Sequence, residues 1–299
     1  MKRIGIVIIA LLISVGISAQ GKTEQPGTLK VGMMSAVDSI PFYYAQNMGY
    51  FSEEGVNVEL ILFSNGQNRQ TALQTGQVDG SMTDIISLIT SAHSGFPLKG
   101  TLSTDGVFPL LSRIDIKRED IITAGVMEVS VTNYLLDAYL KETPTINKVY
   151  INDIPTRLEA LTSQKLDLGI FPEPFASIGA LRGLTKIVFD EVLTESVDII
   201  AFTEKALNEK NEEIASFHRA YERAVLDLHL DKTKGEEVLF AAISNLPKEI
   251  KGTISIPHFH KSRVPSKEFV QELITYTKEL APHIGTILYT DLIDESFIQ

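Results

Sequence analysis

The 299-residue sequence contains no cysteine and no tryptophan. The absence of cysteine excludes disulfide bonds, thiolate zinc sites, iron–sulfur clusters, a cysteine nucleophile and a lipid-modified N-terminal cysteine. Aromatic packing therefore depends on 14 Phe and 9 Tyr. Basic residues are also few, because 27 Lys and Arg stand against 38 Asp and Glu, for a formal net charge of -11. The bases are scattered along the chain, so we expect no nucleic-acid partner.

Long hydrophobic runs are absent except at the N-terminus. There, residues 4–17 are almost wholly apolar, after Met1-Lys2-Arg3 and before Ser18-Ala19-Gln20. A positive start, an apolar stretch and a small-residue site are the three parts of a secretory signal peptide. We expect a signal peptide over 1–19, cleaved after Ala19, and a flexible lead-in over 20–27. An uncleaved membrane anchor is the alternative. No later segment approaches the ~20 apolar residues of a membrane span, so we expect a soluble mature chain. An export signal without any cysteine to carry a lipid predicts a periplasmic protein that is not a lipoprotein.

From residue 28 onward, segments typical of strands alternate with segments typical of helices. The pattern predicts strands at 29–34, 56–63, 78–82, 97–103, 107–112, 121–126, 148–151, 166–171 and 197–203. It predicts helices at 41–48, 67–75, 84–93 and 130–142, a long helix through 207–228 and a last one at 267–280. Such alternation is typical of an α/β fold with crossover helices.

One sequence pattern recurs at an offset of 88 residues. The segments are Ala72-Leu73-Gln74-Thr75-Gly76-Gln77-Val78-Asp79 and Ala160-Leu161-Thr162-Ser163-Gln164-Lys165-Leu166-Asp167. Each combines a helix end, a tight turn and an Asp before a buried strand. Chance recurrence of common helix–turn–strand chemistry is one explanation. The other is two lobes of the same architecture, with a ligand cleft between them.

Two regions resemble one family of solute-binding proteins. The first contains Ile40-Pro41-Phe42-Tyr43-Tyr44-Ala45, residues 49–60 and the Ala-Leu-x-x-Gly-x-Val-Asp turn at 72–79. The second contains residues 158–167 and Phe171-Pro172-Glu173-Pro174-Phe175. The combination is similar to the binding proteins of ABC importers for thiamine-pyrimidine precursors, sulfonates such as taurine, and nitrate. The resemblance covers about residues 28–202, and it departs at Gln164, where that turn commonly carries glycine.

The resemblance implies an α/β, two-lobe periplasmic-binding-protein fold (type II) with two crossover strands and a ligand cleft between the lobes. Lobe 1 is expected over 28–112 plus 203–299, and lobe 2 over 113–202. The implied function is the extracytoplasmic substrate-binding component of an ABC importer. Its partners would be a small-molecule ligand and an inner-membrane permease. We expect a monomer without a cofactor, a metal or catalytic residues.

Ligands of open α/β sheets bind at the carboxyl ends of the strands, which selects the candidate loops. These are residues 35–41, 64–67, 82–84, 127–130, 152–153 and 171–174. In and beside them lie the residues that we predict to bind ligand: Asp38, Tyr43, Tyr44, Asn65, Thr83, Asp84, Glu128, Asn152 and Glu173. One of the two tyrosines is expected to face the cleft and the other the core, and the sequence does not distinguish them.

The charge of these loops indicates a class of ligand. No Lys or Arg lies inside them, and Arg69 and Arg113 are the nearest in sequence. Carboxylates and tyrosines favour an amino-bearing or heteroaromatic solute, such as an aminopyrimidine. A sulfonate or nitrate held by helix N-terminal amides is the alternative. Glu173 is expected to project toward the opposite lobe, so that Glu173→Gln would weaken an amino-bearing ligand.

Motifs for catalysis are lacking. There is no Gly-x-Ser-x-Gly nucleophile elbow and no glycine-rich phosphate loop. An enzyme of similar fold remains a second alternative. The cysteine-rich iron motif of a fungal pyrimidine synthase has no counterpart here, and menaquinone-pathway enzymes are cytosolic, which the signal layout disfavours. His258 and His260 could chelate a metal, but no third ligand is evident, so we expect a surface or interface role for them.

Overall fold

The computed structural model describes residues 27–117, 121–141, 145–189, 195–231 and 233–298. The expected signal peptide and nearly all of the lead-in lie outside these residues. No helix in the described parts of the chain is both long and apolar enough to cross a membrane.

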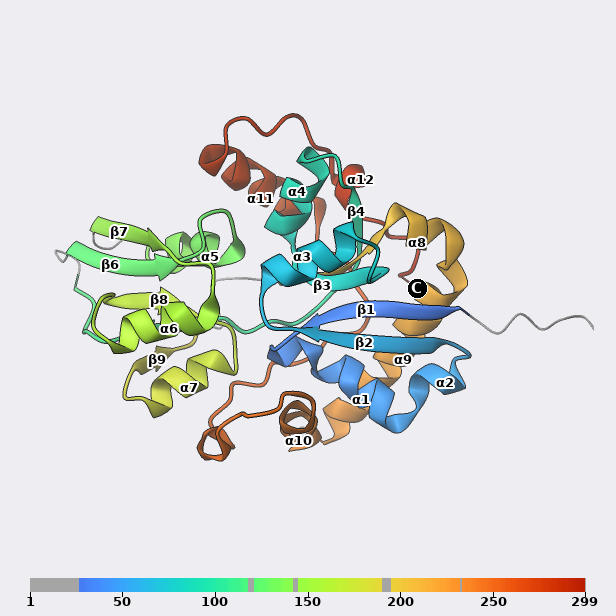
Figure 1. Ribbon diagram of the computed structural model, residues 1–299, viewed down its shortest axis with the longest axis horizontal. Helices are drawn as coiled ribbons and strands as arrows, with labels where there is room; N and C mark the ends of the chain where they lie inside the picture. Colours follow the sequence, from blue (N-terminus) through green and yellow to red (C-terminus); the bar gives the residue numbers. More distant parts are fainter. Residues whose placement is uncertain (1–26, 118–120, 142–144, 190–194, 232, 299) are drawn as a thin grey trace, which may run out of the picture.

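Two five-stranded sheets form the framework, one in each lobe (Figure 1). The first sheet has the order β2-β1-β3-β10-β4, and its strands are β1 (Thr28–Met34), β2 (Asn57–Phe63), β3 (Gly80–Asp84), β4 (Leu98–Ser103) and β10 (Asp198–Thr203). The second has the order β7-β6-β8-β5-β9, with β5 (Leu110–Ser112), β6 (Ile121–Val126), β7 (Thr145–Tyr150), β8 (Leu168–Ile170) and β9 (Thr185–Ile187). In each sheet the first three strands are parallel and the fourth is antiparallel to both neighbours. The predicted two-lobe α/β fold is confirmed.

Helices cover both faces of the first sheet. One face packs against α1 (Ile40–Met48), α2 (Tyr50–Glu53), α9 (Asn211–Leu230) and α10 (Thr233–Ala242). The other packs against α3 (Gly66–Gln74), α4 (Ile85–His93), α11 (Lys267–Leu280) and α12 (Tyr289–Leu292). Strand β10 is apolar from Ile199 to Phe202 because helices cover both faces of its sheet. Successive side chains of a strand point to opposite faces, so Ile200 and Phe202 enter the first cluster while Ile199 and Ala201 enter the second.

The second lobe has three helices in its described residues: α5 (Val131–Tyr139), α6 (Ile154–Thr162) and α7 (Phe175–Leu181). Side chains of α5 belong to the second hydrophobic cluster, and those of α6 and α7 form a third cluster. The predicted helix at 207–228 is divided into α8 (Glu204–Glu209) and α9. The break falls at Lys210, whose ammonium group donates hydrogen bonds to Thr28 O (2.8 Å) and to the Asp79 carboxylate (2.7 Å). These tertiary contacts have no signature in the helical periodicity.

The recurring sequence pattern marks equivalent units of the two lobes. Strands β2 and β7, helices α3 and α6, and strands β3 and β8 each begin 88 residues apart. Asp79 and Asp167 also make the same contacts. Asp79 exchanges two hydrogen bonds with the backbone of Lys30 in β1, and Asp167 does so with Thr123 in β6. Two lobes of one architecture therefore explain the recurrence, and coincidence does not.

The predicted lobe boundaries at 112/113 and 202/203 place two strands, β5 and β10, in the wrong lobe. Residues 110–112 were assigned to lobe 1, but β5 pairs with β8 and β9 of the second sheet. Residues 198–202 were assigned to lobe 2, but β10 pairs with β3 and β4 of the first sheet. Apolar periodicity identifies a buried strand but does not say which sheet it joins. The chain crosses between β4 and β5, and again between β9 and β10.

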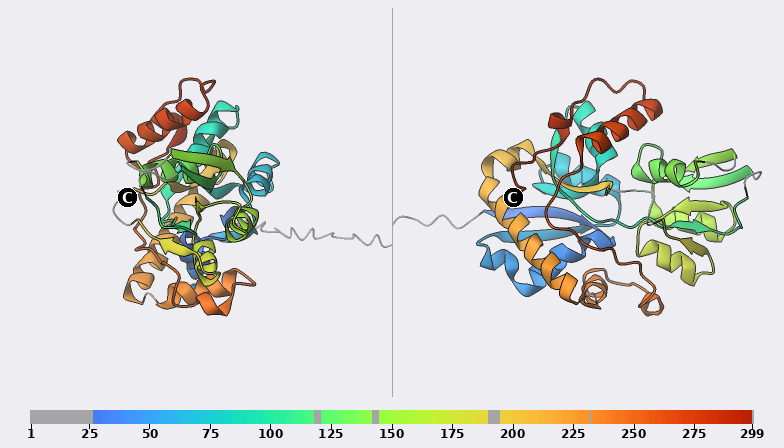
Figure 2. Two further views of the ribbon diagram at one scale, coloured as in Figure 1. Left: turned by 90° about the vertical axis from the view of Figure 1, so that its left-hand side faces the viewer. Right: turned by 180° about the vertical axis from the view of Figure 1, so that it is seen from behind.

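Besides the crossovers, several contacts join the lobes, and two of them involve helices from both sides. The first lies between α5 and α11, where the Tyr134 ring is 5.2 Å from the Tyr276 ring and its hydroxyl donates to Glu272 at 2.8 Å. The second lies between α7 and the short helix η2 (Lys248–Ile250). Seen from behind, the chain between α10 and α11 runs along the back of the molecule (Figure 2).

Candidate functional site: a cavity between the lobes

A cavity of about 700 Å³ lies between the two sheets. Its first-lobe wall is built by the loops after β1, β2 and β3, and its second-lobe wall by those after β6, β7 and β8. All six loops selected from the sequence contribute residues to the lining. The helices α3, α4, α5 and α6 begin at these loops, so their N-terminal turns converge on the cavity. The cavity thus lies at the carboxyl ends of strands from both lobes, where ligands of open α/β sheets generally bind.

Five of the nine candidate residues line this cavity: Asp38, Asn65, Thr83, Asp84 and Asn152. Two of them also cap helices. The Asn65 side chain accepts a hydrogen bond from Asn68 N at 2.9 Å, and Asp84 accepts from Ser87 N at 2.8 Å. Asp153 caps α6 in the same way through Thr156 N at 2.9 Å. Helix α5 has no side-chain cap, so its first turn presents uncapped amide groups beside the hydroxyls of Ser130 and Thr132.

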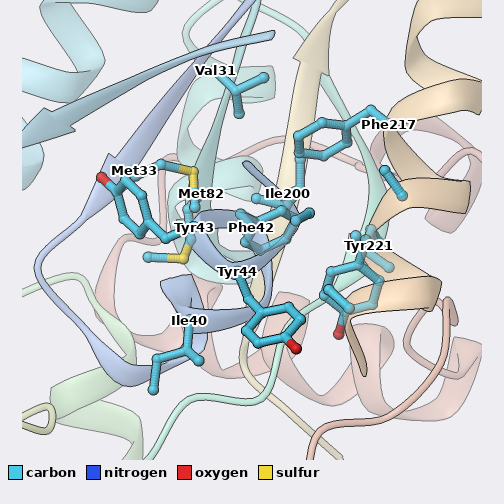
Figure 3. Packing of buried hydrophobic residues seen from close by; sticks show 14 of the residues in the cluster. Val31, Met33, Ile40, Phe42, Tyr43, Tyr44, Met82, Ile200, Phe217 and Tyr221 are labelled. Carbon is cyan, nitrogen blue, oxygen red and sulfur yellow. The ribbon is translucent and has the colours of Figure 1, made fainter. Parts of the chain in front are cut away.

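Neither Tyr43 nor Tyr44 lines the cavity, so the expectation that one of them faces the cleft is not met. Both rings lie among the buried side chains of the first cluster, together with Met33 and Phe42 (Figure 3). Burial raises the pKa of Tyr43 to about 12. The hydroxyl of Tyr44 donates to Asp227 of α9 at 3.3 Å. Because α9 lies far along the sequence, the local pattern at 40–45 does not reveal that it covers this face of α1.

Glu128 and Glu173 also lie outside the cavity lining. The side chain of Glu128 is exposed. Glu173 is fully buried, and its carboxylate accepts hydrogen bonds from Ser177 N and Oγ, from Lys186 Nζ at 2.7 Å, and from Ser255 N at 3.1 Å. Its carbonyl oxygen accepts from Val37 N of the first lobe at 3.2 Å. Glu173 therefore joins the lobes instead of projecting into the cleft as expected.

Two arginines that are not among the nine candidate residues, Arg69 and Arg157, line the cavity, which is therefore not purely acidic. Arg69 lies in the first turn of α3, and Arg157 in the first turn of α6. Each is buried, and the Nε atom of each lacks a hydrogen-bond partner. Arg157 Nη1 donates to Ile151 O at 2.6 Å, and its guanidinium lies 5.1 Å from the centre of the Phe171 ring. Burial lowers the pKa of Arg157 to about 10.

A sequence signal for this arginine pair exists. Arg69 and Arg157 are 88 residues apart, the offset of the internal repeat, so they hold equivalent positions in the two lobes. Extending the recurring pattern by three residues toward the N-terminus reveals both. Arg113, the other arginine noted from the sequence, is instead bound to Asp167.

Three carboxyl groups share the first-lobe wall: Asp38, Asp84 and Asp198. Burial raises the pKa of Asp38 to about 6, against the effect of a hydrogen bond donated by Thr104 Oγ1 at 2.8 Å. Burial also raises the pKa of Asp198 well above its ordinary value, and the nearby carboxyl groups of Asp38 and Asp84 raise it further. Asp198 is not among the sequence candidates, which lie at the carboxyl ends of strands, because it begins its strand; the antiparallel pairing of β10 with β3 brings it beside Asp84. The wall can therefore offer acceptors to a ligand and can also hold a proton.

His258 and His260 each contact another side chain. No group of three or more His, Asp or Glu side chains that could hold a metal ion occurs within the described residues. The His258 ring instead stacks on His229 at 4.4 Å, and His260 Nδ1 lies 2.9 Å from Asp105 Oδ1.

Comparison with known proteins relates this geometry to one fold. Residues 36–104 match the NMT1/THI5-like family. No curated protein sequence matches the chain. Among solved structures, the chain is similar to the ligand-binding component of an ABC-type import system from Staphylococcus aureus with zinc bound. The identity is 16% and the TM-score 0.75, over 90% of this chain and 97% of that chain.

Two further structures come from proteins whose names include their ligands. The periplasmic aliphatic sulphonate binding protein SsuA from Escherichia coli is 14% identical, with a TM-score of 0.73 over 90% of this chain and 92% of that chain. The periplasmic nitrate-binding protein NrtA from Synechocystis PCC 6803 is 12% identical, with a TM-score of 0.59 over 92% of this chain and 77% of that chain. The chain thus carries an NMT1/THI5-like segment over residues 36–104 and has the fold of the periplasmic binding proteins.

Proposed function

We propose that the protein is the substrate-binding component of an ABC importer and captures a small polar solute in the cavity between its lobes. The observation that carries this proposal is the cavity of about 700 Å³, into which helix N-termini from two equivalent lobes converge. A cavity of this size suits a small molecule, and the crossovers allow the lobes to move about a hinge. Binding needs no nucleophile or base, so we propose capture without catalysis. The S. aureus, E. coli and Synechocystis proteins of the same fold support this proposal through their names.

For the ligand we favour an amino-bearing or heteroaromatic solute, similar to a thiamine-pyrimidine precursor. Asp38, Asp84 and Asp198 supply three carboxyl groups to the first-lobe wall, while Arg69 is the basic residue of that wall. A buried carboxylate without a partner costs several kcal/mol. A donor or a positive charge on the ligand would remove that cost.

A sulfonate or nitrate anion is the second candidate, and the structure gives it more support than the sequence did. Arg69 and Arg157 each keep an Nε atom without a hydrogen-bond partner, and the first turn of α5 has no side-chain cap. Guanidinium groups and helix N-termini both bind anions. The two candidates therefore differ in which groups hold the charged end of the ligand: the carboxyl groups of the first-lobe wall, or Arg69, Arg157 and the first turn of α5.

The proposed setting is the periplasm, after cleavage behind Ala19, with an inner-membrane permease as the partner of a monomeric binding protein. Intact-mass analysis of protein recovered from periplasm should give an N-terminus at Gln20. A recovered species that retains Lys2 and Arg3 would contradict cleavage.

A thermal-shift screen of the refolded mature protein tests the function. Refolding removes copurified ligand, and a bound solute raises the melting temperature by mass action. The screen compares an aminopyrimidine precursor of thiamine with taurine, an alkanesulfonate and nitrate. Two variants then identify the groups that hold the charged end of the ligand. Arg157→Met should weaken the binding of an anion, and Asp198→Asn should weaken the binding of a cation. If no solute raises the melting temperature, or if the best one is turned over chemically, the proposal fails.

A further inference from the structure

The carboxyl groups of the first-lobe wall outnumber their positive partners. Asp84 and Asp198 stand directly opposite each other in the antiparallel pair of β3 and β10. Like charges in such a cross-strand pair repel each other. Asp84 accepts hydrogen bonds from Ser87 N and Oγ at the start of α4, so two donors already stabilise its carboxylate. The unfavourable charge is therefore expected on Asp198.

Thr104 links the backbone carbonyl of Asp198 to the carboxylate of Asp38. Its backbone N donates to Asp198 O at 3.1 Å, and its hydroxyl donates to Asp38 Oδ2 at 2.8 Å. Asp38 is 1% exposed, and its other oxygen, Oδ1, has no hydrogen-bond partner although the residue lines the cavity. Gly106 closes the space around Asp198, since a Cβ atom there would lie 2.2 Å from Asp198 Oδ2. The site thus combines two buried carboxyl groups with an acceptor atom left unused.

The charged groups around this pair do not neutralise it. Arg69 of α3 is the positive group that acts on Asp198, and it acts on Asp84 as well. Asp105 adds a further negative charge near Asp38, but Arg263 and His260 already bind its carboxylate. Tyr221 of α9 is buried nearby, and burial raises the pKa of its hydroxyl, so it remains neutral. Burial raises the pKa of both Asp38 and Asp198, and repulsion from Asp38 and Asp84 raises the pKa of Asp198 further.

We propose that Asp38 and Asp198 form a carboxyl pair that holds one shared proton in the empty cavity and exchanges it for a positively charged nitrogen of the ligand. The inference rests on the proposed function, because it assigns the cationic end of a captured solute to this pair. When the ligand binds, the proton leaves to solvent and the ligand nitrogen takes its place, so the total charge of the wall stays the same. Asp38 Oδ1 is the acceptor that the incoming nitrogen would use.

The proton itself can be tested without any ligand. Infrared spectra of the empty wild-type protein at neutral pH should contain the C=O stretching band of a protonated carboxyl group. Asp198→Asn and Asp38→Asn should each remove this band. Both changes keep the shape of the side chain and remove a repulsive charge, so the variants are expected to fold. If neither variant changes the band, the pair holds no proton and the inference is overturned.

The exchange is tested by calorimetry with three probes: the aminopyrimidine precursor of thiamine, benzamidine and, as the uncharged control of the same shape, benzamide. Titration in buffers of different ionisation enthalpy should show release of about one proton per bound benzamidine, which is a cation at neutral pH, and none for benzamide. Below the pKa of the pair, affinity for the cation should increase about tenfold per pH unit. Asp198→Asn should abolish this pH dependence and weaken the cation about 10–100-fold at neutral pH.

Asp153→Asn is the matched control, because Asp153 lines the opposite wall and asparagine also caps a helix. This variant should retain the proton release. Cations that bind without releasing a proton would overturn the exchange and leave the proposed function intact. Binding restricted to taurine, alkanesulfonates or nitrate would overturn the inference as well, with solute capture still standing. If no solute binds, the proposed function fails, and the infrared band still decides whether the pair holds a proton.

Discussion

Gln164 is one of two non-glycine residues with a positive φ in the described chain, at 64°. Its equivalent in the first lobe is Gly76, with a φ of 70°. The sequence already marked Gln164 as a departure, and the structure shows that the turn keeps its left-handed geometry despite the side chain. We predict that Gln164→Gly raises the free energy of unfolding by about 0.5–1 kcal/mol, since only glycine adopts this conformation without steric cost.

The reverse change in the other lobe is the control. Gly76→Gln should lower the free energy of unfolding by about 1 kcal/mol, because the two turns have the same geometry. Urea unfolding of both variants measures the difference. A destabilised Gln164→Gly protein would mean that the glutamine side chain contributes contacts that outweigh the strain.

We predict that His218 of α9 makes the stability of the protein depend on pH. The residue is buried, its Nε2 lies 3.0 Å from Thr101 Oγ1, and its Nδ1 has no partner. Burial lowers the pKa of His218 to about 3, from its ordinary value of 6.5. The folded protein therefore binds fewer protons than the unfolded chain, so stability is lost as the pH falls below 6.5.

The expected loss from His218 is roughly 3 kcal/mol by about pH 4. Asp38 acts in the opposite direction, because burial raises its pKa to about 6, and the stability that it provides at low pH is lost as the pH rises through that value. Thermal unfolding of the wild type and of His218→Gln over this range separates the two effects. Parallel curves for the two proteins would exclude His218 as the cause.

At the scale of elements, Glu173 holds α7, β9 and the segment after η2 together. Its buried carboxylate is bound by Ser177, Lys186 and Ser255. We predict that Glu173→Gln lowers the free energy of unfolding by about 2–4 kcal/mol, because it leaves the Lys186 ammonium without its buried partner. The exposed pair of Glu159 and Arg182 provides the control, and Glu159→Gln should change stability by less than about 0.5 kcal/mol.

Ligand affinity distinguishes this structural role from the one expected from the sequence. If Glu173 acts as a connector, Glu173→Gln lowers stability more than it lowers affinity in calorimetry. A folded variant of unchanged stability that loses an amino-bearing ligand would restore Glu173 to the site.

At the scale of the whole molecule, the contact between α5 and α11 is predicted to favour closed lobes. Tyr134 lies against both Tyr276 and Phe269 of α11, with ring centres 5.2 and 6.5 Å away. Tyr134→Ala should increase the radius of gyration of the empty protein in small-angle scattering. It should also weaken ligand binding, because the closed state becomes less populated. Tyr134→Phe keeps the ring and loses the hydrogen bond to Glu272, so it should stay close to the wild type.

The scattering experiment is then repeated with saturating ligand. Ligand should reduce the radius of gyration of the wild type, and of Tyr134→Ala by a larger amount. An identical radius with and without a bound ligand, in both proteins, would contradict hinge closure.

The sequence by itself determined the class of the fold and the general location of the cavity. Apolar strands that alternate with helices, and a pattern that recurs after 88 residues, are local features of the chain. The carboxyl ends of parallel strands meet at one edge of a sheet whatever the side chains are, so all six expected loops reach the cavity. The recurrence also contained the arginine pair, since equivalent positions in two lobes of one architecture face the same cavity.

Only the tertiary structure decided which side chains enter the cavity and which sheet each buried strand joins. Glu173 turns away because its partners Lys186 and Ser255 come from other segments. Tyr44 is covered by α9, and Asp198 enters the wall because β10 pairs with β3. These outcomes depend on contacts between residues far apart in the chain. Local periodicity fixes where a strand or helix forms, but the partners that it meets, and so the direction in which a loop side chain points, arise only when the two lobes pack.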